Sequence, residues 1–493
     1  MPLRSLVRSR GLRSFLSEFK NSKTGTLGLA LLVALIFIAI GFPLIGSEEA
    51  IRNWSNLEYW QDYPKKQPPC WAARGSFETV VLTSEAQEEG KIIVREFVTP
   101  EGLKVASFSV PFRVESRPPT NINLKFRVSY NSTTWVLISL SRPDGLEVYL
   151  TSSTIGGANG TTIKSVFGIP SSEYSGPASK QLSAHVSKLR NVEAYLKPWL
   201  ESLGLKIESA HISMLAQSAF DLLFRKASLN MLTERDYLRG VYNLTIAFAS
   251  EDSNLRAQVE KIVLVGGCYG LMGTDSYGRD LLQGVLYGVR WALVIGLLVS
   301  FASVVLGGVY GVVSGYVGGI VDEVMLRVAQ VFYSIPVLPL LILLSAILKP
   351  SIWNLVLLLI VFGWPGTALV TRSMALQLKE ETYVEAARAL GAGHARIVVF
   401  YILPQVLPYL FASIALSVPN AVLTEAGVSF LGLTDPSVVT WGRILNEAEA
   451  AAATINGYWW WVIPPGVMIT IVGATFIFIG QALDTILNPR LKR

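Results

Sequence analysis

Six apolar segments constrain the fold of this chain more than any other feature of its sequence. They run over residues 26–45, 291–313, 330–348, 353–371, 405–430 and 463–485. Each approaches the roughly 20 residues that an α-helix needs to cross a bilayer. Charged residues make up only 16% of the chain, whereas soluble proteins carry about 25%. The pattern predicts an α-helical polytopic membrane protein with six transmembrane helices.

Charge is distributed unevenly around the first apolar segment. Residues 4–23 carry six basic side chains and one acid, whereas Glu48 and Glu49 follow the segment. Lys and Arg are retained on the cytoplasmic side of membrane proteins, so the N-terminus is predicted to be cytoplasmic. Six crossings return the C-terminus, residues 488–493, to the same side. We therefore expect a multi-pass protein of the cell (plasma) membrane with both termini in the cytoplasm.

Four regions follow from this pattern. Residues 1–24 form a cytoplasmic segment, 25–45 the first transmembrane helix, 46–270 a large extracellular insertion and 271–493 a core of five helices. The first apolar stretch is longer than the core of a secretory signal and lacks a small-residue cleavage site. We therefore interpret it as a retained membrane anchor.

The long polar insertion is predicted to be an α+β domain. Residues 123–130, 134–140 and 146–150 alternate apolar with polar residues or are rich in strand formers, which is typical of β-strands. Pro143-Asp144-Gly145 is a turn signal between the last two. Residues 179–203 and 213–239 carry apolar side chains at helical spacing, so two helices are expected there.

Outside the cell, two cysteines of this domain could be bridged, and the sequons of the chain support that extracellular position. Cys70 and Cys268 lie near its ends, and an oxidising exterior would allow them to form a disulfide; two buried free thiols are the alternative. All four glycosylation-type sequons of the chain also fall between the first two apolar segments, although chance would place some there. These sequons begin at Asn53, Asn131, Asn159 and Asn243.

The sequence lacks the features of an ATP-binding or catalytic protein. It has no phosphate-binding G-x-x-x-x-G-K-[ST] loop and no recognisable nucleophile–base set. Its three histidines and two cysteines do not follow the spacing of a zinc site, and its basic residues are not interleaved with aromatics as in nucleic-acid binders. We expect no catalytic residue, metal or cofactor in this chain. Energy for any active process must then come from a partner.

The most informative motif lies in the polar stretch between the fourth and fifth apolar segments. Glu385-Ala-Ala-Arg-Ala-Leu-Gly391 predicts a short amphipathic helix that ends at a glycine. Acids near its start suit the helix dipole, and Leu403 and Pro404 follow downstream. A helix of small side chains, held in water at the membrane surface, is suited to entering a groove on a soluble partner. An ordinary surface helix is the alternative.

Residues 273–493 resemble the C-type permease subunit of dipeptide/oligopeptide ABC importers. The stretch that begins at Glu385 resembles the EAA motif of this family. Two features depart from the family pattern. Tyr401 replaces the apolar β-branched residue that many family loops carry, and the 46–270 domain is far longer than the corresponding region of the family. The other segments that carry the resemblance are Gly273-Thr-Asp-Ser-Tyr-Gly-Arg-Asp280, Leu286-Tyr-Gly-Val-Arg290, Gly318-Gly-Ile-Val-Asp-Glu-Val-Met-Leu-Arg327, Ser334-Ile-Pro336, Ser429-Phe-Leu-Gly-Leu433, Trp441-Gly442 and Asn488-Pro-Arg490.

The resemblance implies both a fold and an assembly. It implies a type I ABC importer-like core in the lipid bilayer, a second permease beside it, two ATPase subunits that bind ATP and Mg²⁺, and an extracellular solute-binding protein. Peptides are the family's best-known cargo, and oligosaccharides or metal chelates are alternatives. The residues that the resemblance assigns to ATPase coupling are Glu385, Ala386, Ala387, Gly391, Leu403 and Pro404.

One acid lies inside an apolar segment. Because a carboxylate is costly in lipid, Glu425 is a candidate for the translocation pathway or its gate; a hydrogen bond to the neighbouring loop is the alternative. Two functions of another class are alternatives to a permease. A membrane receptor with an extracellular sensor domain would need cytoplasmic signalling domains, and an ion channel would need polar rings along its helices.

Overall fold

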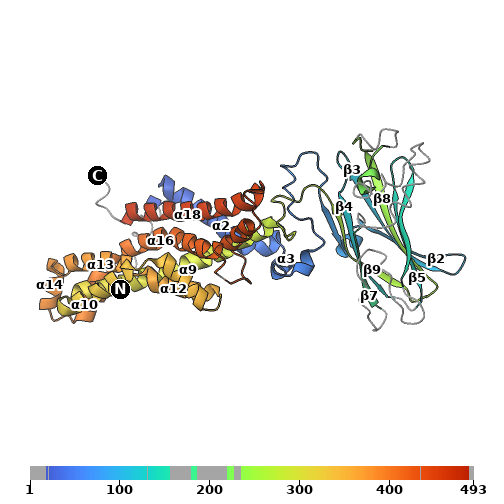
Figure 1. Cartoon of the computed structure of the whole chain (residues 1–493). Helices are drawn as coiled ribbons and strands as arrows, with labels where there is room; N and C mark the ends of the chain where they lie inside the picture. The colour runs from blue at the N-terminus through green and yellow to red at the C-terminus, as the bar shows by residue number, and fades with distance from the viewer. Residues whose placement is uncertain are drawn as a thin grey trace, which may run out of the picture. The chain divides into compact units, whose positions relative to one another are not determined.

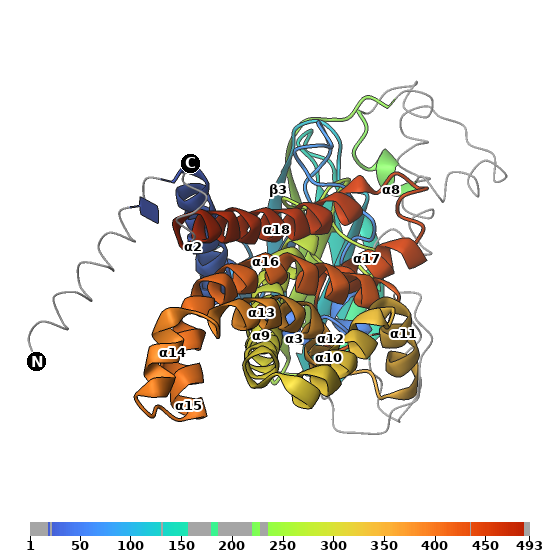
Figure 2. The ribbon, with the colours of Figure 1, turned by 90° about the vertical axis from the view of Figure 1, so that its left-hand side faces the viewer.

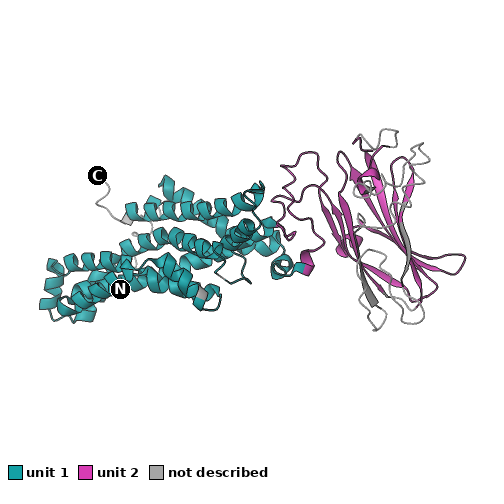
Figure 3. Ribbon diagram, viewed as in Figure 1, with its two compact units in different colours: residues 1–57, 281–493 teal, residues 58–280 magenta. Residues whose placement is uncertain are grey.

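The structure is a computed structural model that describes residues 18, 19, 22–129, 132–155, 179–185, 219–226, 235–433 and 435–487. It divides into two compact units, coloured separately in Figure 3. The first unit contains residues 1–57 and 281–493, and the second contains residues 58–280. The second unit therefore begins and ends slightly later along the chain than the 46–270 insertion proposed from the sequence.

The first unit is helical, and Figure 1 labels most of its elements. Its N-terminal part contains α2 (Lys23–Ile45) and α3 (Glu48–Arg52), and α4 (Leu57–Trp60) lies at the boundary. The remaining elements are α9 (Leu281–Val317), α10 (Gly319–Ser334), α11 (Val337–Ile347), α12 (Ile352–Gly363), α13 (Pro365–Leu378), α14 (Thr382–Ala389), α15 (His394–Ile397), a π-helical turn (Val398–Ile402), α16 (Leu403–Phe430), α17 (Trp441–Ala450) and α18 (Trp459–Leu487).

Within the described residues, five helical runs are long and apolar enough to cross a membrane. A sixth crossing results if α10 and α11, which are bent by 74° at the break between them, act as one span. The prediction of a polytopic helical protein is thus confirmed. The five runs are Lys23–Ile45, Leu281–Val317, Ile352–Leu378, His394–Phe430 and Trp459–Ile486.

The third predicted segment differs from the structure in one respect. Residues 330–348 were predicted as one apolar crossing, and in the structure this segment is divided between two helices, since α10 ends at Ser334 and α11 begins at Val337. Pro336 has no N–H to donate to the preceding turn and pushes the residue before it out of the helical region. Ile335 accordingly adopts an extended conformation, with φ −71° and ψ 126°.

The helix α9 packs tightly against α13 through a row of glycines spaced four residues apart. A Cβ atom on Gly311 would lie 2.1 Å from the carbonyl oxygen of Ala368, and Gly307 and Gly315 approach α13 almost as closely. Small residues at this spacing let two membrane helices bring their backbones together. The hydroxyl of Thr371 uses this proximity to donate a hydrogen bond to the carbonyl of Gly307, at 3.2 Å.

The second unit is built on two antiparallel sheets. One has the strand order β1-β9-β4-β7 and the other β2-β3-β8-β5-β6. The helices α5 (Glu85–Glu88) and α8 (Ala219–Leu222) are short. The strands are β1 (Val80–Thr83), β2 (Ile93–Val98), β3 (Lys104–Val114), β4 (Asn121–Ser129), β5 (Thr134–Ser141), β6 (Glu147–Ile155), β7 (Ser179–His185), β8 (Gly240–Ser250) and β9 (Arg256–Val265).

The core of this unit lies between alternating apolar faces of the two sheets. On β8, Tyr242, Leu244, Ile246 and Phe248 are all buried, and the residues between them are not fully buried. This period of two is the signature of a strand with one face against a core. The three strands predicted at residues 123–130, 134–140 and 146–150 correspond to β4, β5 and β6. Gly145, in the turn before β6, has φ +81°.

The two helices predicted in this region are wrong for most of the residues that the structure describes. Residues 179–185 form β7, which pairs with β4 from Asn123↔His185 to Ser129↔Ser179. Among the described residues of the 213–239 segment, only 219–222 are helical, and Arg225 and Tyr237 form an isolated β-bridge. In residues 179–185 the neighbouring strand β4 satisfies the backbone hydrogen-bonding groups of β7. Such tertiary pairing outweighs a weak helical periodicity. Residues 186–203 lie outside the described part of the chain.

Candidate coupling site

The predicted surface helix is present as α14. It begins at Thr382 after Glu381, which is extended with φ −71° and ψ 141°, and Glu385 lies in its first turn. A carboxylate there faces the positive end of the helix dipole. At the other end Gly391 has φ +81°. Its N–H donates to Arg388, and the N–H of Ala392 donates to Ala387. These two bonds form a Schellman motif.

One face of α14 is anchored to the helical unit. Val384 and Ala387 expose 0% and 5% of their surfaces, and Val384 belongs to a buried cluster that includes Val312 of α9 and Ile402 of the π-helical turn. The hydroxyl of Tyr316, near the end of α9, is 2.9 Å from Nδ1 of His394. The loop is therefore held in place by apolar packing and by a polar contact.

The opposite face of α14 is open. Glu385 and Ala386 are exposed, and Leu390 exposes 89% of its surface. Of the other predicted coupling residues, Leu403 packs against the same buried cluster as Val384, and Pro404 is exposed in the first turn of α16. The structure thus divides the predicted coupling residues into those that pack against the helical unit and those whose side chains are exposed. Periodicity alone did not distinguish them.

α14 and α3 lie at opposite ends of the helical unit, as Figure 1 shows. The N–H of Ser47, just before α3, donates a hydrogen bond to Oε1 of Gln283, near the start of α9, at 2.8 Å. Tyr316, which holds the α14–α15 loop, is near the end of α9. At 1.5 Å per residue these points on α9 are roughly 50 Å apart, which exceeds the thickness of a bilayer with its headgroups. Figure 2 shows α14 and α15 together at the edge of the bundle.

A partly buried ion pair near this site was missed by the sequence interpretation. Asp322 of α10 accepts hydrogen bonds from Nε and Nη2 of Arg372 on α13, both at 2.6 Å, and from Ser314 of α9 at 2.5 Å. Bidentate arginine–carboxylate pairs fix geometry as well as charge. The available signal was an acid and an arginine at the ends of neighbouring apolar segments, but the sequence does not show that these ends meet.

Glu425 is 3% exposed within α16. Its Oε1 accepts a hydrogen bond from Ser429, one turn later, at 2.6 Å. The hydroxyl of Ser429 is 3.5 Å from that of Thr440, which caps α17. This carboxyl therefore lies in a polar contact between α16 and the start of α17, the arrangement expected if it anchors the neighbouring loop.

The other candidate residues occupy varied positions. Cys70 and Cys268 are joined by a disulfide within the second unit, with a Cα–Cα distance of 4.8 Å. Asn53 is half-buried, and its Nδ2 donates to the carbonyl of Glu49. Asn243 lies on β8, between β3 and β5. Asn131 and Asn159 fall outside the described residues.

These features define a multi-pass membrane protein with an exposed amphipathic helix at one end of its bundle. Residues 307–493 match the family described as binding-protein-dependent transport system inner membrane component. The dipeptide transport system permease protein DppC of Bacillus subtilis is 32% identical over 247 residues, which cover 50% of this chain and 77% of that protein. The chain belongs to this family of transport permeases.

Two further relatives show the same degree of similarity. The oligopeptide transport system permease protein OppC of Bacillus subtilis is 32% identical over 45% of this chain and 72% of its own length. The dipeptide transport system permease protein DppC of Haemophilus influenzae is 34% identical over 45% of this chain and 75% of its own length.

Proposed function

We propose that this chain is the permease subunit of an ATP-driven peptide importer. Its family membership and helical unit support the role of a permease, and the dipeptide and oligopeptide transport systems of its relatives support peptides as cargo. A second permease completes the translocation path in this proposal, and an extracellular solute-binding protein delivers the cargo. ATP and Mg²⁺ bind to two separate ATPase subunits rather than to this chain.

The observation that carries the proposal is the exposed face of α14. A helix that transmits a conformational change between two subunits must pack rigidly against its own subunit and expose a surface to the other. Val384 and Ala387 supply the attachment, while Glu385, Ala386 and Leu390 supply the surface. Closure of the ATPases can shift the permease between conformations only if this contact is stronger in one conformation than in the other.

We assign α14 to the cytoplasm and residues 58–280 to the exterior. The chain enters and leaves the second unit at residues 57 and 281, next to α3 and the start of α9, and α14 lies at the other end of α9. The six basic residues before α2 favour a cytoplasmic N-terminus. The Cys70–Cys268 disulfide suits an oxidising exterior.

A double variant tests the coupling role. We expect Glu385→Lys with Gly391→Trp to abolish ATP-dependent peptide uptake by the reconstituted complex, because the first reverses a charge on the presented face and the second disfavours the left-handed C-cap that positions it. Membrane insertion should be unchanged. Glu323→Lys is the matched control, because Glu323 is an exposed acid on α10 outside the presented face. Normal uptake by the double variant would exclude α14 as the coupling site.

A further inference from the structure

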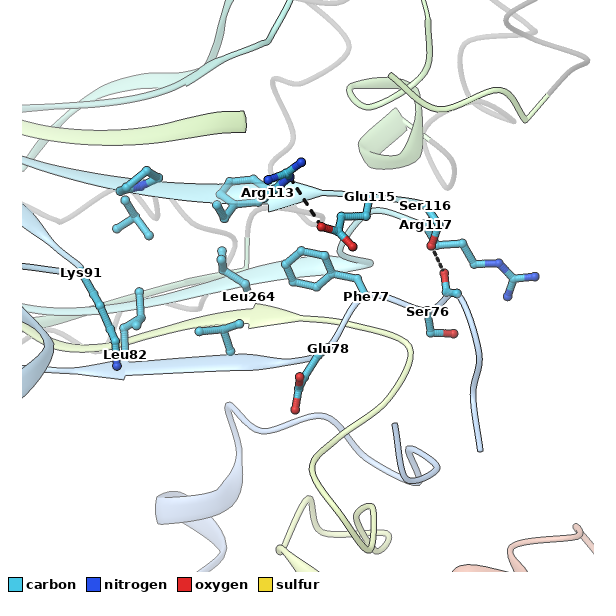
Figure 4. A pocket seen from close by; sticks show the side chains of 15 residues that line it. Ser76, Phe77, Glu78, Leu82, Lys91, Arg113, Glu115, Ser116, Arg117 and Leu264 are labelled. Atoms are coloured by element: carbon cyan, nitrogen blue, oxygen red, sulfur yellow. Dashed lines mark hydrogen bonds and ion pairs between the residues drawn. The ribbon is translucent and has the colours of Figure 1, made fainter. Parts of the chain in front are cut away.

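A cleft of about 650 Å³ opens in the second unit between the edges of β1 and of the last part of β3, which no described strand covers (Figure 4). Its charges are mixed along its length. Arg113 and Arg117 share one end with Glu115, and Lys91 at the other end contacts Glu89 at 2.6 Å. The cleft therefore indicates no particular ligand, whereas a polar cluster in the helical unit has a more definite arrangement.

The helix α10 lies between two breaks in the chain. At its start, Gly318 and Gly319 have φ +72° and +59°, a region of backbone space that residues with a Cβ atom rarely adopt. At its end, the chain bends by 74° before α11. Residues at the ends of elements, small ones among them, absorb the changes in backbone angle when a segment turns as a rigid body. α10 can therefore change its angle to α9 while its own hydrogen bonds stay intact.

Few side chains of α10 are buried. Of its 16 residues, only Asp322 and Ala329 are buried. Its other two charged residues, Glu323 and Arg327, lie 3.9 Å apart with largely exposed side chains. A neutral contact also holds the helix, since the hydroxyl of Tyr310 on α9 donates to a backbone carbonyl of α10 at 2.8 Å. Asp322 is thus the charged side chain by which α10 is attached to its neighbours.

Asp322 joins α10 to two other helices through three hydrogen bonds. Two come from the guanidinium of Arg372 on α13, both at 2.6 Å, and one comes from the hydroxyl of Ser314 on α9. The side chains of Asp322 and Arg372 are 11% and 23% exposed, so water competes little for these bonds. A bidentate pair fixes the direction of both side chains, and removing one partner leaves the other charge without compensation. The cluster therefore holds α10 at one angle to α13.

The other end of this connection is α14. Arg372 lies in α13, which ends at Leu378, and α14 begins at Thr382. Val384 of α14 belongs to the same buried cluster as Ala375, which lies three residues after Arg372 on α13. A displacement of α14 is therefore passed to the last turns of α13, and from there to the guanidinium that holds α10.

We propose that the Asp322–Arg372 pair transmits movement of α14 to α10 during transport. When the ATPases shift α14, the end of α13 moves with it, and the pair turns α10 about Gly318 and Gly319. The bent span of α10 and α11 then changes its angle in step with α14. Asp322 and Arg372 are positioning residues, because they act through α10 rather than on the cargo. The inference rests on the proposed function, since it takes α14 as the site of ATPase contact.

Asp322→Asn tests this link in the reconstituted complex. The amide keeps the size of the side chain but removes the charge that holds the guanidinium. We expect ATP hydrolysis within about twofold of wild type and about tenfold less peptide imported per ATP hydrolysed, because substitutions between coupled sites change coupling by amounts of this order. Glu323→Gln is the matched control, because it removes the charge of the neighbouring, exposed acid, and it should leave this ratio unchanged.

Arg372→Lys tests the geometry of the pair apart from its charge. Lysine keeps a positive charge beside Asp322 but cannot form the bidentate contact. The amount of peptide imported per ATP should fall about threefold, less than in Asp322→Asn. This variant also decides the question if Asp322→Asn fails to assemble, because the carboxylate keeps a cation beside it. A wild-type ratio in Arg372→Lys, or hydrolysis that falls in proportion to import in either variant, would overturn the proposal.

A distance measurement follows the movement itself. Spin labels are attached at Val324→Cys on α10 and Leu357→Cys on α12, positions that are 57% and 60% exposed. With cysteine-free partner subunits, trapping the complex in its ATP-bound state should shift the distance between the labels in the otherwise wild-type chain. The shift should be lost in Asp322→Asn. An equal shift in both chains would show that α10 moves without the pair and would overturn the proposal.

The inference and the proposed function fail in different ways. If the variant with Glu385→Lys and Gly391→Trp loses import while Asp322→Asn keeps the wild-type ratio, α14 couples the ATPases but the pair does not transmit its movement. If the complex imports no peptide, yet ATP shifts α10 only when the pair is intact, the transmission holds and the proposed cargo is wrong.

Discussion

At the scale of single residues, one demanding contact of the second unit is made by a buried arginine. The Arg142 side chain is 0% exposed, and its partner Asp144 is 26% exposed at 2.8 Å. Arg142 also donates to the carbonyls of Leu223 and Arg225, so it connects the β5–β6 turn to the segment after α8. A buried charge needs this full set of partners, because its desolvation is not otherwise offset.

Removing the carboxylate should therefore be costly. We expect Asp144→Asn to destabilise the second unit by about 2–3 kcal/mol, below the full range for a buried pair because Asp144 is partly exposed. Asp236→Asn removes an exposed pair with Lys226 and should cost less than about 1 kcal/mol. Thermal melting of the full chain in nanodiscs measures both, with hydrogen–deuterium exchange of β5 identifying the unit that melts. Equal melting temperatures would contradict the argument.

The same pair predicts a pH dependence. Partial burial raises the pKa of Asp144, but the hydrogen bonds and charge of Arg142 outweigh burial and hold that pKa below its usual 3.8. A depressed folded-state pKa contributes stability above the unfolded value that is lost as pH falls through the folded one. The wild-type unit should therefore lose stability below about pH 4, and Asp144→Asn should lose less. Melting temperatures measured from neutral to acidic pH would show parallel curves if Asp144 were not involved.

At the scale of elements, the packing of α9 on α13 positions the start of the loop that contains α14. The glycine row lets α13 lie against α9 up to Arg372, whose guanidinium binds Asp322 of α10. Three helices thus meet immediately before α14. Any change in their spacing would move the attached loop.

Gly311→Ala should disturb this contact. Its added Cβ atom would lie 2.1 Å from the Ala368 oxygen, and overpacking of this kind costs about 1–3 kcal/mol. Gly427→Ala is the control, because a Cβ atom on that α16 glycine would have no neighbour within 4 Å. Size-exclusion chromatography after heating in detergent measures thermostability, which should fall for Gly311→Ala and stay unchanged for Gly427→Ala. Similar elution of both after heating would refute tight α9–α13 packing.

At the scale of the whole molecule, the proposed topology is open to direct labelling. In the described part of the chain both cysteines are joined in the disulfide, so an introduced cysteine is the one reactive thiol there. Leu390→Cys and Val98→Cys introduce it at positions that are 89% and 66% exposed, at the C-cap of α14 and on β2 respectively. The two positions belong to different units.

We expect a membrane-impermeant maleimide to label Val98→Cys in intact cells and Leu390→Cys only in inverted vesicles. Charged reagents do not cross the hydrocarbon core, so each reports one side of the bilayer. The unsubstituted chain should react only after reduction. Labelling of Leu390→Cys from outside would place α14 on the wrong side for an ATPase and would end the coupling proposal.

The sequence determined whatever depends on local pattern. The length of the apolar segments predicted the helical spans, because a lipid-exposed backbone must satisfy its hydrogen bonds within the helix. Alternation predicted β4 and β5, and Glu385 with Gly391 predicted both ends of α14. Tertiary structure alone decided the non-local features. β7 became a strand by pairing with β4, Asp322 met Arg372 across 50 positions, and two open strand edges came together around a cleft. Such contacts depend on which elements become neighbours, and no periodicity within one segment records that.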